Sequence, residues 1–486
     1  MRTTFSGIEI ARRALQAQQR SLDIVGHNVA NANTPGYARQ KAIHTASQPY
    51  PSPQLGNNPH NGQMGTGVQI SQVTRMRDEF VEMRLRQENH NHGYWQSMQD
   101  GLEQVELIFN EPSENNIHHA LDMYWDSMQQ VSKHPDNESV RAVVLQRAEV
   151  LVETVRHARS QLGRLRDNMN SVVSIKVNEI NSLADRVAQL NDQIGKVTSS
   201  GNNPNDLLDK RDELLQRLSE ITNIEVVEDQ TRMVMVSVGG TTLVQRNQVS
   251  PLSVKLSNED VNPKYDRVEV IWPGIEIPAN ITGGELGGIL HFRDEEMQGF
   301  IQDLNQWTAD VFNTVNAMHR KGYTLNDQQG EDFFAIAGGQ NGQLIGPNDD
   351  ASQSIRLRVP SARDIAASSH QLDGKTVVGN GEIALEIAGL RYNAIAEGGT
   401  TLADSFNSII SRLGVKAQES RVMLDNGGIL VNHLQGLRES VSGVSLDEEM
   451  ADMIRFQHAY TAAARIMTMM DETLDVIINR LGTMGR

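Results

Sequence analysis

A heptad repeat that begins at Leu446 and runs almost to the end of the chain limits most strongly how this sequence can fold. Apolar or aromatic residues recur every seven positions from Leu446, and a second row lies three positions after each of them. Glu449 is the one polar residue in these rows. A narrow apolar stripe with a 3.5-residue period predicts a coiled-coil helix that needs a partner helix along its whole length. The predicted interface residues are Leu446, Met453, Phe456, Tyr460, Met467, Met470, Leu474, Ile477 and Leu481.

A matching repeat lies at the other end of the chain, in residues 1–43. A Ser6–Glu9 pair predicts a capping box at the start of this helix. The segment has six basic and two acidic residues, whereas residues 446–486 have seven acidic and four basic ones. Opposite net charges favour pairing of the two helices, although each flanking ion pair contributes only about 0.3–0.5 kcal/mol. The alternative is two ordinary amphipathic helices on a globular body. The predicted interface residues are Ile8, Leu15, Leu22, Val25 and Val29.

Between these ends the sequence predicts a helical shaft that is interrupted twice. Helices are expected over 77–109 and 139–165, over a long segment that ends near Ser200, over 206–221 and over 283–323. A β-hairpin is expected on either side of Gly239–Gly240, and a strand at 68–73. The fold class is therefore mainly α with β insertions: a terminal coiled coil, an elongated helical bundle and two mainly-β outer sections. The expected parts are 1–45 and 445–486 for the coiled coil, 46–222, 283–323 and 401–444 for the shaft, and 223–282 and 324–400 for the insertions.

Two breaks in the helical pattern are predicted near the coiled coil. Pro35–Gly36 suits the centre of a type II turn, because proline fixes φ and glycine accepts a positive φ. The heptad phase that reaches Val444 does not continue into the phase that starts at Leu446, so residues 442–445 form a joint and Ser445 caps the next helix. Gly427–Gly428 predicts a break or a kink in the helix before this joint.

Composition excludes several classes of function. The chain has no cysteine, which excludes disulfides and thiolate metal sites, and its net charge of −17 argues against sequence-independent nucleic-acid binding. A transmembrane run and a cleavable signal peptide are not expected. Histidines occur close together at His90 and His92 and at His118 and His119, but no His-Glu-x-x-His, phosphate-loop or nucleophile-elbow sequence is present. We therefore predict no enzyme, no metal and no cofactor.

The residues around the first turn carry a family resemblance. The sequence Asn-Val-Ala-Asn-Ala-Asn-Thr-Pro-Gly-Tyr at 28–37 resembles the N-terminal signature of bacterial flagellar rod, hook and hook-associated proteins. Its continuation at 37–40 resembles the hook-associated branch of that family, and the resemblance extends to 205–215, 283–323 and 441–481. The signature residues are Asn28, Asn31, Asn33, Thr34, Pro35, Gly36 and Tyr37.

This resemblance implies a structural role in the flagellum. It implies self-association in a ring at the junction of hook and filament, with contacts to the hook protein and to a second junction protein. The terminal helices would line the central channel and fold on assembly, and an export chaperone would bind the C-terminal helix before the chain leaves the cell without a cleaved signal. The methionines of the C-terminal seam suit two successive partners, but also suit an ordinary core. The alternatives are a hook or distal rod subunit of the same family, and a soluble coiled-coil scaffold that carries an enzymatic insertion at 324–399.

Overall fold

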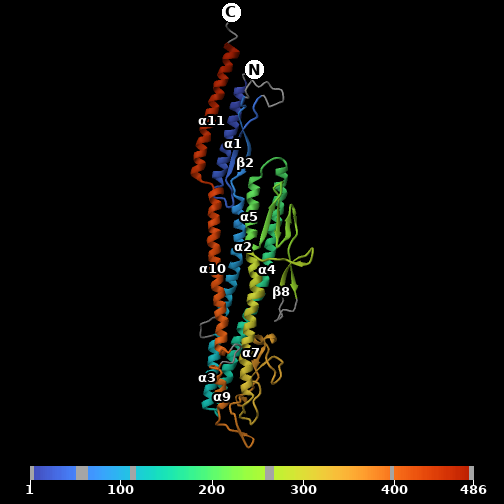
Figure 1. The fold of residues 1–486 in the computed structure, drawn as a ribbon, viewed down its shortest axis with the longest axis vertical. Coiled ribbons are helices and arrows are strands. Elements are labelled where there is room, and N and C mark those ends of the chain that lie inside the picture. Colours follow the sequence, from blue (N-terminus) through green and yellow to red (C-terminus); the bar gives the residue numbers. More distant parts are fainter. Residues whose placement is uncertain (1–4, 51–63, 110–115, 258–266, 394–398, 481–486) are drawn as a thin grey trace.

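The chain forms a long rod (Figure 1). The computed structural model describes residues 5–50, 64–109, 116–257, 267–393 and 399–480. The terminal helices α1 and α11 form one end of the rod, and the second insertion, with α3 and α9, forms the other (Figure 1). The fold class expected from the sequence is confirmed, because long helices dominate and the strands form small antiparallel sheets.

The terminal end contains two helices and a hairpin. Helix α1 spans Ser6–Ala30 and lies against α11, which spans Leu446–Asp475 and continues as a π-helical turn at Val476–Arg480. Strands β1 (Gln40–Ala46) and β2 (Val68–Arg75) pair antiparallel beside α1. The predicted capping box was wrong. Ser6 is the first helical residue, and the Glu9 carboxylate accepts hydrogen bonds from Arg12 and Arg13 instead of a backbone N–H.

The shaft is a bundle around one continuous core. Helix α4 is a single helix of 62 residues, about 93 Å long at 1.5 Å per residue, so the two helices expected over 139–199 are one. Apolar residues spaced mostly three or four positions apart, from Val144 to Ile194, are buried against the neighbouring elements. The other shaft and distal helices are α2 (Glu79–Phe109), α3 (Ile117–Lys133), α5 (Asn205–Ile221), α6 (Gly284–His291), α7 (Met297–His319) and α10 (Leu402–Ser442).

The predicted helix at 283–323 is interrupted. Residues Phe292–Glu296 form a π-helical turn between α6 and α7, and α7 ends at His319. The extra residue in this turn buries Arg293, whose guanidinium donates to the Val268 carbonyl oxygen (2.8 Å) and to Asn170. The interruption therefore fastens the first insertion to the shaft.

The first insertion contains two sheets that pack on α4. The hairpin predicted around Gly239–Gly240 is confirmed. Asn191 of α4 bonds the backbone of Val234 and Arg246. The four-stranded sheet has β3 (Ile224–Glu228), β4 (Val234–Val238), β5 (Thr241–Gln245) and β6 (Gln248–Val249), and the three-stranded sheet has β7 (Ser253–Ser257), β8 (Arg267–Trp272) and β9 (Ile277–Pro278).

The second insertion has fewer strands and more helix than the sequence suggested. Its helix α9 buries one face, which packs on α3, and was not predicted. Buried Arg159 of α4 forms two hydrogen bonds to the carboxylate of Asp350 and so ties the insertion to the shaft. Its elements are β10 (Phe334–Ile336), α8 (Ala351–Ser354), β11 (Ile355–Leu357), β12 (Gln371–Leu372), β13 (Lys375–Thr376) and α9 (Glu382–Gly389), with 3-10 turns at Pro347–Asp349 and Ala362–Asp364.

The breaks near the coiled coil have different outcomes. Helix α10 ends at Ser442 and α11 begins at Leu446, with the Ser445 side chain accepting from the Glu448 N–H, as predicted. The break expected at Gly427–Gly428 does not occur, because α10 runs through both glycines without interruption. The imidazole of His92 on α2 lies 3.6–3.8 Å from where a Cβ atom at either glycine would stand, which is ordinary contact distance, and α2 and α10 pack against each other here.

Candidate functional site

The coiled coil meets the shaft at a cluster of buried polar side chains centred on Asn28. This residue lies in the last turn of α1 and is 1 % exposed. Its Oδ1 accepts from the Tyr37 hydroxyl (2.8 Å) and from the Gln40 N–H (3.0 Å). Its Nδ2 donates to the Gln40 carbonyl oxygen (2.9 Å) and to Glu449 Oε2 (3.0 Å). The full hydrogen-bonding capacity of one amide therefore joins α1, the following turn, β1 and α11.

The turn after α1 brings Tyr37 back onto the helix. The Tyr37 N–H donates to the Thr34 carbonyl oxygen (3.2 Å), and Gly36 has φ of +74°, as the predicted type II turn requires. Asn31 closes the helix end by donating to the His27 carbonyl oxygen (2.9 Å). The signature thus contains one buried anchor, one half-buried aromatic and an exposed turn of Asn33, Thr34, Pro35 and Gly36 that lets the two meet.

Arg39 completes the contact with α11. Its Nε donates to Glu449 Oε1 (2.6 Å), its Nη1 donates to Glu448 Oε2 (2.7 Å), and its backbone N–H donates to the Ser442 carbonyl oxygen (2.9 Å). Glu449 is 1 % exposed and accepts from both Asn28 and Arg39, so its charge is paired. The polar exception in the C-terminal heptad is therefore the residue that fixes α11 to the N-terminal segment.

Helix α5 holds the other side of the joint through three aspartates spaced three apart. Asp206 accepts from the Gln40 side chain (2.8 Å), and Asp209 accepts from the Ala38 N–H (3.2 Å). Arg75, at the end of β2, donates to Asp209 (2.7 Å) and to Asp212 (2.8 Å). This spacing puts the three carboxylates on one helix face. They lie within 205–215, one of the stretches that carry the family resemblance.

Burial and charge act in different directions at these groups. Burial raises the pKa of Asp209 despite its contact with Arg75. Burial also disfavours the charged form of Asp212. The attraction of three positive charges is stronger than this effect and lowers the pKa of the carboxyl; they belong to Arg77, Arg211 and Arg75. Burial raises the pKa of the Tyr37 hydroxyl, which stays a hydrogen-bond donor to Asn28.

Along the coiled coil, the predicted interface residues differ in exposure. Val25 is buried, and Ile8, Leu15, Leu22 and Val29 are half-buried in α1. Leu446, Tyr460 and Ile477 remain exposed, and Leu481 lies outside the described residues. The half-buried seam residues of α11 are Met453, Phe456, Met467, Met470 and Leu474.

Some contacts in the coiled coil were not foreseen from the heptad. His44 of β1 stacks on Phe456 with 6.2 Å between ring centroids, and its Nε2 lies 3.0 Å from Ser21 Oγ on α1. Met470 packs on Gly7, where a side chain would approach its sulfur atom to 2.9 Å. Helix α1 thus contacts both α11 and the hairpin, and polar Ser21 faces the hairpin. In the sequence, the one sign of the hairpin contact is Ser21, a small polar residue within an amphipathic helix; its burial appears only in the structure.

The histidines considered as metal ligands have other contacts. His92 packs on Gly427–Gly428, and His118 lies 3.6 Å from the carboxylate of Asp122. Burial lowers the pKa of His90. Within the described ranges, His, Asp and Glu side chains do not form a group of three suited to a metal ion, and none of the helices there is long and apolar enough to cross a membrane.

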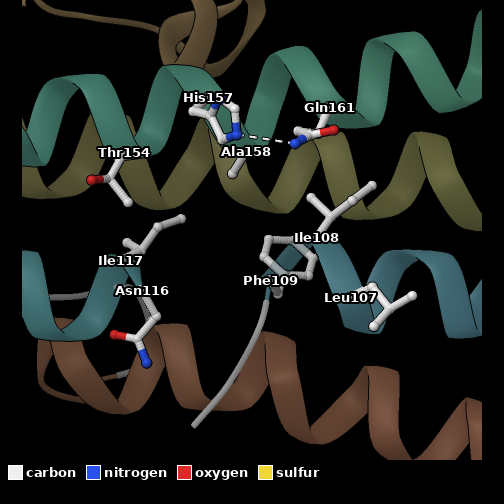
Figure 2. Close-up of a pocket in the computed structure, with 9 residues that line it drawn as sticks. All are labelled: Leu107, Ile108, Phe109, Asn116, Ile117, Thr154, His157, Ala158 and Gln161. Atoms are coloured by element: carbon white, nitrogen blue, oxygen red, sulfur yellow. Dashed lines mark hydrogen bonds between the residues drawn. The ribbon is translucent and has the colours of Figure 1, made fainter. Parts of the chain in front are cut away.

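A hollow of about 490 Å³ lies farther along the rod, between the end of α2, the start of α3 and α4 (Figure 2). Phe109, Ile117 and Ala158 give it apolar walls, and His157 and Gln161 form a hydrogen bond at its rim (2.9 Å) (Figure 2). Among the described residues, its lining includes no Asp, Glu, Lys or Arg. We assign no chemistry to it.

Comparisons with known proteins agree with this architecture. The profile of the "Flagellar hook-associated protein FlgK helical domain" matches residues 102–334, and profiles of a "Flagella basal body rod protein" and of a "Flagellar basal body rod FlgEFG protein C-terminal" region match 8–37 and 438–481. The last two coincide with the signature and with α11. A structure described as that of the flagellar hook junction protein FlgK from Burkholderia pseudomallei has a TM-score of 0.63 and 17% identity, and the match covers 74% of this chain and 100% of that one.

Relatives that align over their full length show the family of this chain. Flagellar hook-associated protein 1 of Bacillus subtilis is 31% identical over 514 aligned residues, with 100% of both chains covered. The protein of the same name from Escherichia coli is 26% identical, with 97% of this chain and 99% of that one covered. The match to the Bacillus protein extends through the coiled coil, the joint, the shaft and both insertions, and this chain therefore belongs to the flagellar hook-associated protein 1 family.

Proposed function

We propose that this chain is the structural adaptor that joins hook to filament, and that the joint around Asn28 transmits force between its coiled coil and its shaft. The observation that carries the proposal is the hydrogen-bonded set of Asn28, Arg39 and Glu449, which joins both terminal helices to the segment after α1. The backbone N–H of Arg39 also donates to Ser442, at the end of the shaft helix α10. Buried, charge-assisted hydrogen bonds resist bending at a helix junction better than an exposed linker does. An adaptor between two tubes needs such stiffness.

We infer the partners of this role by analogy with the family. The chain assembles with copies of itself in the axial structure of the flagellum, and we infer that these copies form a ring. The hook protein would contact one side of the ring, and a second junction protein the other. The family is structural, and no catalytic role is proposed for 324–400, in which Asp350 bonds Arg159 of the shaft.

The coiled coil would face the central channel. Helix α11 keeps exposed apolar residues after it has packed on α1, including Ile454, Ile466 and Met469. In water such a surface favours association, so it supports contacts with neighbouring copies in the assembly and with an export chaperone before it. Methionine, with its flexible side chain, suits both partners in succession. We further propose that the chain leaves the cell without a cleaved signal, and that α1 and α11 pair stably only within the assembly.

The experiment is a deletion of the gene followed by complementation. Cells without the protein should build hooks and release filament protein into the medium, and the wild-type gene should restore attached filaments. Missing hooks would indicate a hook or rod subunit instead. Unchanged motility would exclude any role in the axial structure and favour the scaffold alternative. Brief proteolysis of the purified monomer should remove both ends and leave the shaft intact; protected ends would contradict folding on assembly.

A further inference from the structure

A polar cleft lies on the shaft at the height of the joint. It has a volume of about 570 Å³ and is lined by the end of β2, the first turns of α2, the beginning of α5, and strands β3 and β4. Arg77, Glu82 and Asp212 line both this cleft and the groove that contains Ser445 and Glu448 at the start of α11. The cleft and the beginning of α11 therefore lie at the same level along the rod.

The walls of the cleft carry arginines whose hydrogen-bonding capacity is only partly used. Arg77 bonds Asp212 and Glu82, and Arg211 donates to Glu228 (2.9 Å). Arg211 is 2 % exposed, yet its Nε–H has no acceptor within the described part of the chain. Arg86 is half-buried and, among the same residues, makes no hydrogen bond or ion pair. Arg211 Nε is too deeply buried to be reached, but a carboxylate entering the cleft would supply the acceptor that Arg86 lacks.

The mouth of the cleft is apolar. Phe80 and Met83, on successive turns of α2, line it and are 61% and 53% exposed. Large side chains of this kind, next to the unpaired guanidinium group of Arg86, are typical of a protein interface. The segment that fits must therefore present an acidic group beside apolar side chains.

The beginning of α11 has this composition. Leu446, Met450 and Ile454 follow one another every fourth residue, and 50–58% of each is exposed. Asp447 lies beside them on the helix, and within the described residues its carboxylate has neither a hydrogen bond nor an ion pair. In the same chain this surface does not enter the cleft, because the bonds of Glu449 with Asn28 and Arg39 hold the beginning of α11 at the end of α1. In Figure 1, α11 and the sheet of β3–β6 lie on opposite sides of the rod.

We propose that the arginine-lined cleft binds the beginning of α11 from a neighbouring copy of this chain, with the partner copy's acidic first turn facing Arg86 and its apolar residues covering Phe80 and Met83. Because the two surfaces lie at the same height on opposite sides, copies related by rotation about an axis parallel to the rod bring them together. Such a contact is heterologous and closes into a ring. The inference rests on the ring proposed above and names its contact.

Cross-linking tests the contact directly, since the chain has no native cysteine. The variant Met83→Cys/Met450→Cys places both thiols at exposed positions, so folding should be preserved. Treatment of isolated hook–basal bodies with a short bismaleimide should give a ladder of dimers and larger species on a denaturing gel. The control Leu107→Cys/Met450→Cys uses an exposed residue at the far end of α2 and should give none. No ladder in flagella that retain their filaments, or an equal ladder in the control, would overturn the contact.

A charge exchange tests the pairing independently. Arg86→Glu should reduce filament retention, and adding Asp447→Arg should restore it, because the two charges then attract again. If Asp447→Arg makes the defect worse or leaves it unchanged, the assignment is wrong. Stabilisation of the purified monomer by inorganic phosphate, lost in Arg86→Gln, together with no cross-link, would show that the cleft binds small anions instead. The gene deletion tests the junction role separately, so failure of this contact is distinguishable from failure of that role.

Discussion

Asn28 and Glu449 lie 421 positions apart in the sequence, and a 3.0 Å hydrogen bond joins the side-chain amide of the first to the carboxylate of the second. Both side chains are almost completely buried. Arg39 supplies the positive charge that makes this burial tolerable for the carboxylate, and burial of the Arg39 guanidinium is outweighed by its hydrogen bonds to Glu449 and Glu448, which raise its pKa. The last turn of α1 and the first turn of α11 are thus held together by a polar contact, in addition to the apolar seam between the two helices.

Removal of Glu449 should loosen α11 from the rest of the molecule. Glu449→Ala removes the acceptor of Arg39 Nε and one of the two acceptors of Asn28 Nδ2, and an unsatisfied buried donor costs about 1–3 kcal/mol. Within the assembly, where we propose that α11 pairs stably with α1, hydrogen exchange should therefore speed up in α11 while the amides of α4 stay protected. Asp471→Ala, at an exposed position farther along α11, is the control and should leave this exchange unchanged. Equal effects of the two changes would rule out a special role for Glu449.

A charge in the α1 seam should prevent assembly without unfolding the shaft. Val25→Asp places an unpaired carboxylate at a position that is 3% exposed, and burial of such a group is strongly unfavourable. We expect loss of filament retention with unchanged helical content of the shaft by circular dichroism. Leu22→Asp should be milder because Leu22 is only half-buried, and exposed Gln19→Asp should have no effect. Attached filaments with Val25→Asp would contradict the importance of the seam.

Replacement of methionine or leucine by glycine in the α11 seam should likewise prevent assembly without unfolding the shaft. Met467→Gly and Leu474→Gly each remove a half-buried side chain and weaken helix propensity by about 1 kcal/mol. These residues belong to α11 and not to the shaft, so the thermal unfolding of the shaft should not change. Assembly should be lost, as measured by electron microscopy of hooks and by filament protein in the medium. Normal motility of both variants would exclude this seam from assembly.

The close crossing of α2 with α5 and α6 should be sensitive to a single methyl group. A Cβ atom at Gly93 would lie 2.4 Å from the Glu220 carbonyl oxygen, and backbone atoms cannot move away as a flexible side chain can. Gly93→Ala should therefore lower the free energy of unfolding by about 1–3 kcal/mol. Gly299→Ala, in open space on α7, should instead be neutral or stabilise by up to about 1 kcal/mol. Urea unfolding of both variants measures the difference.

The distal insertion should lose stability in mild acid through His319. This imidazole is fully buried, donates from Nδ1 to the Glu331 carbonyl oxygen (2.5 Å) and accepts at Nε2 from the Ala366 N–H (2.8 Å). Burial lowers its pKa to about 4, with Asp332 opposing and Arg141 assisting that shift. The folded state therefore holds a neutral ring where the unfolded chain, with the ordinary value of 6.5, would already be protonated.

The sign of the pH dependence follows from these two values. Above about pH 6.5 both states are neutral and stability is unaffected; between 6.5 and 4 the unfolded state gains a proton and stability falls, by roughly 3 kcal/mol in all. Urea unfolding measured from pH 7 to pH 4 should show this loss. His319→Gln should be less stable at pH 7 but should lack this part of the pH dependence. Identical slopes in the two proteins would mean that His319 does not titrate on unfolding.

Much of the fold could be predicted because its signals are local or periodic. The change of heptad phase after Val444 requires a joint, since one straight helix cannot present both stripes to one partner, and α10 ends at Ser442. Pro35–Gly36 specifies its turn through the allowed φ of two residues. Gly427–Gly428 was misjudged because the propensity of glycine is a weak local preference. Packing of α10 on α2, with His92 against the glycines, outweighs it.

The sequence by itself therefore determined where most helices form, which of their faces are apolar, and where the helix before the coiled coil must end. These features follow from backbone sterics and hydrophobic period, which act between near neighbours in the sequence. Only the tertiary structure decided which polar groups meet: that Glu449 reaches Asn28 and Arg39, and that Asp212 reaches Arg77. Such pairs depend on the relative height and rotation of helices that are hundreds of residues apart. Those are set by packing of the whole core, and a heptad pattern does not contain them.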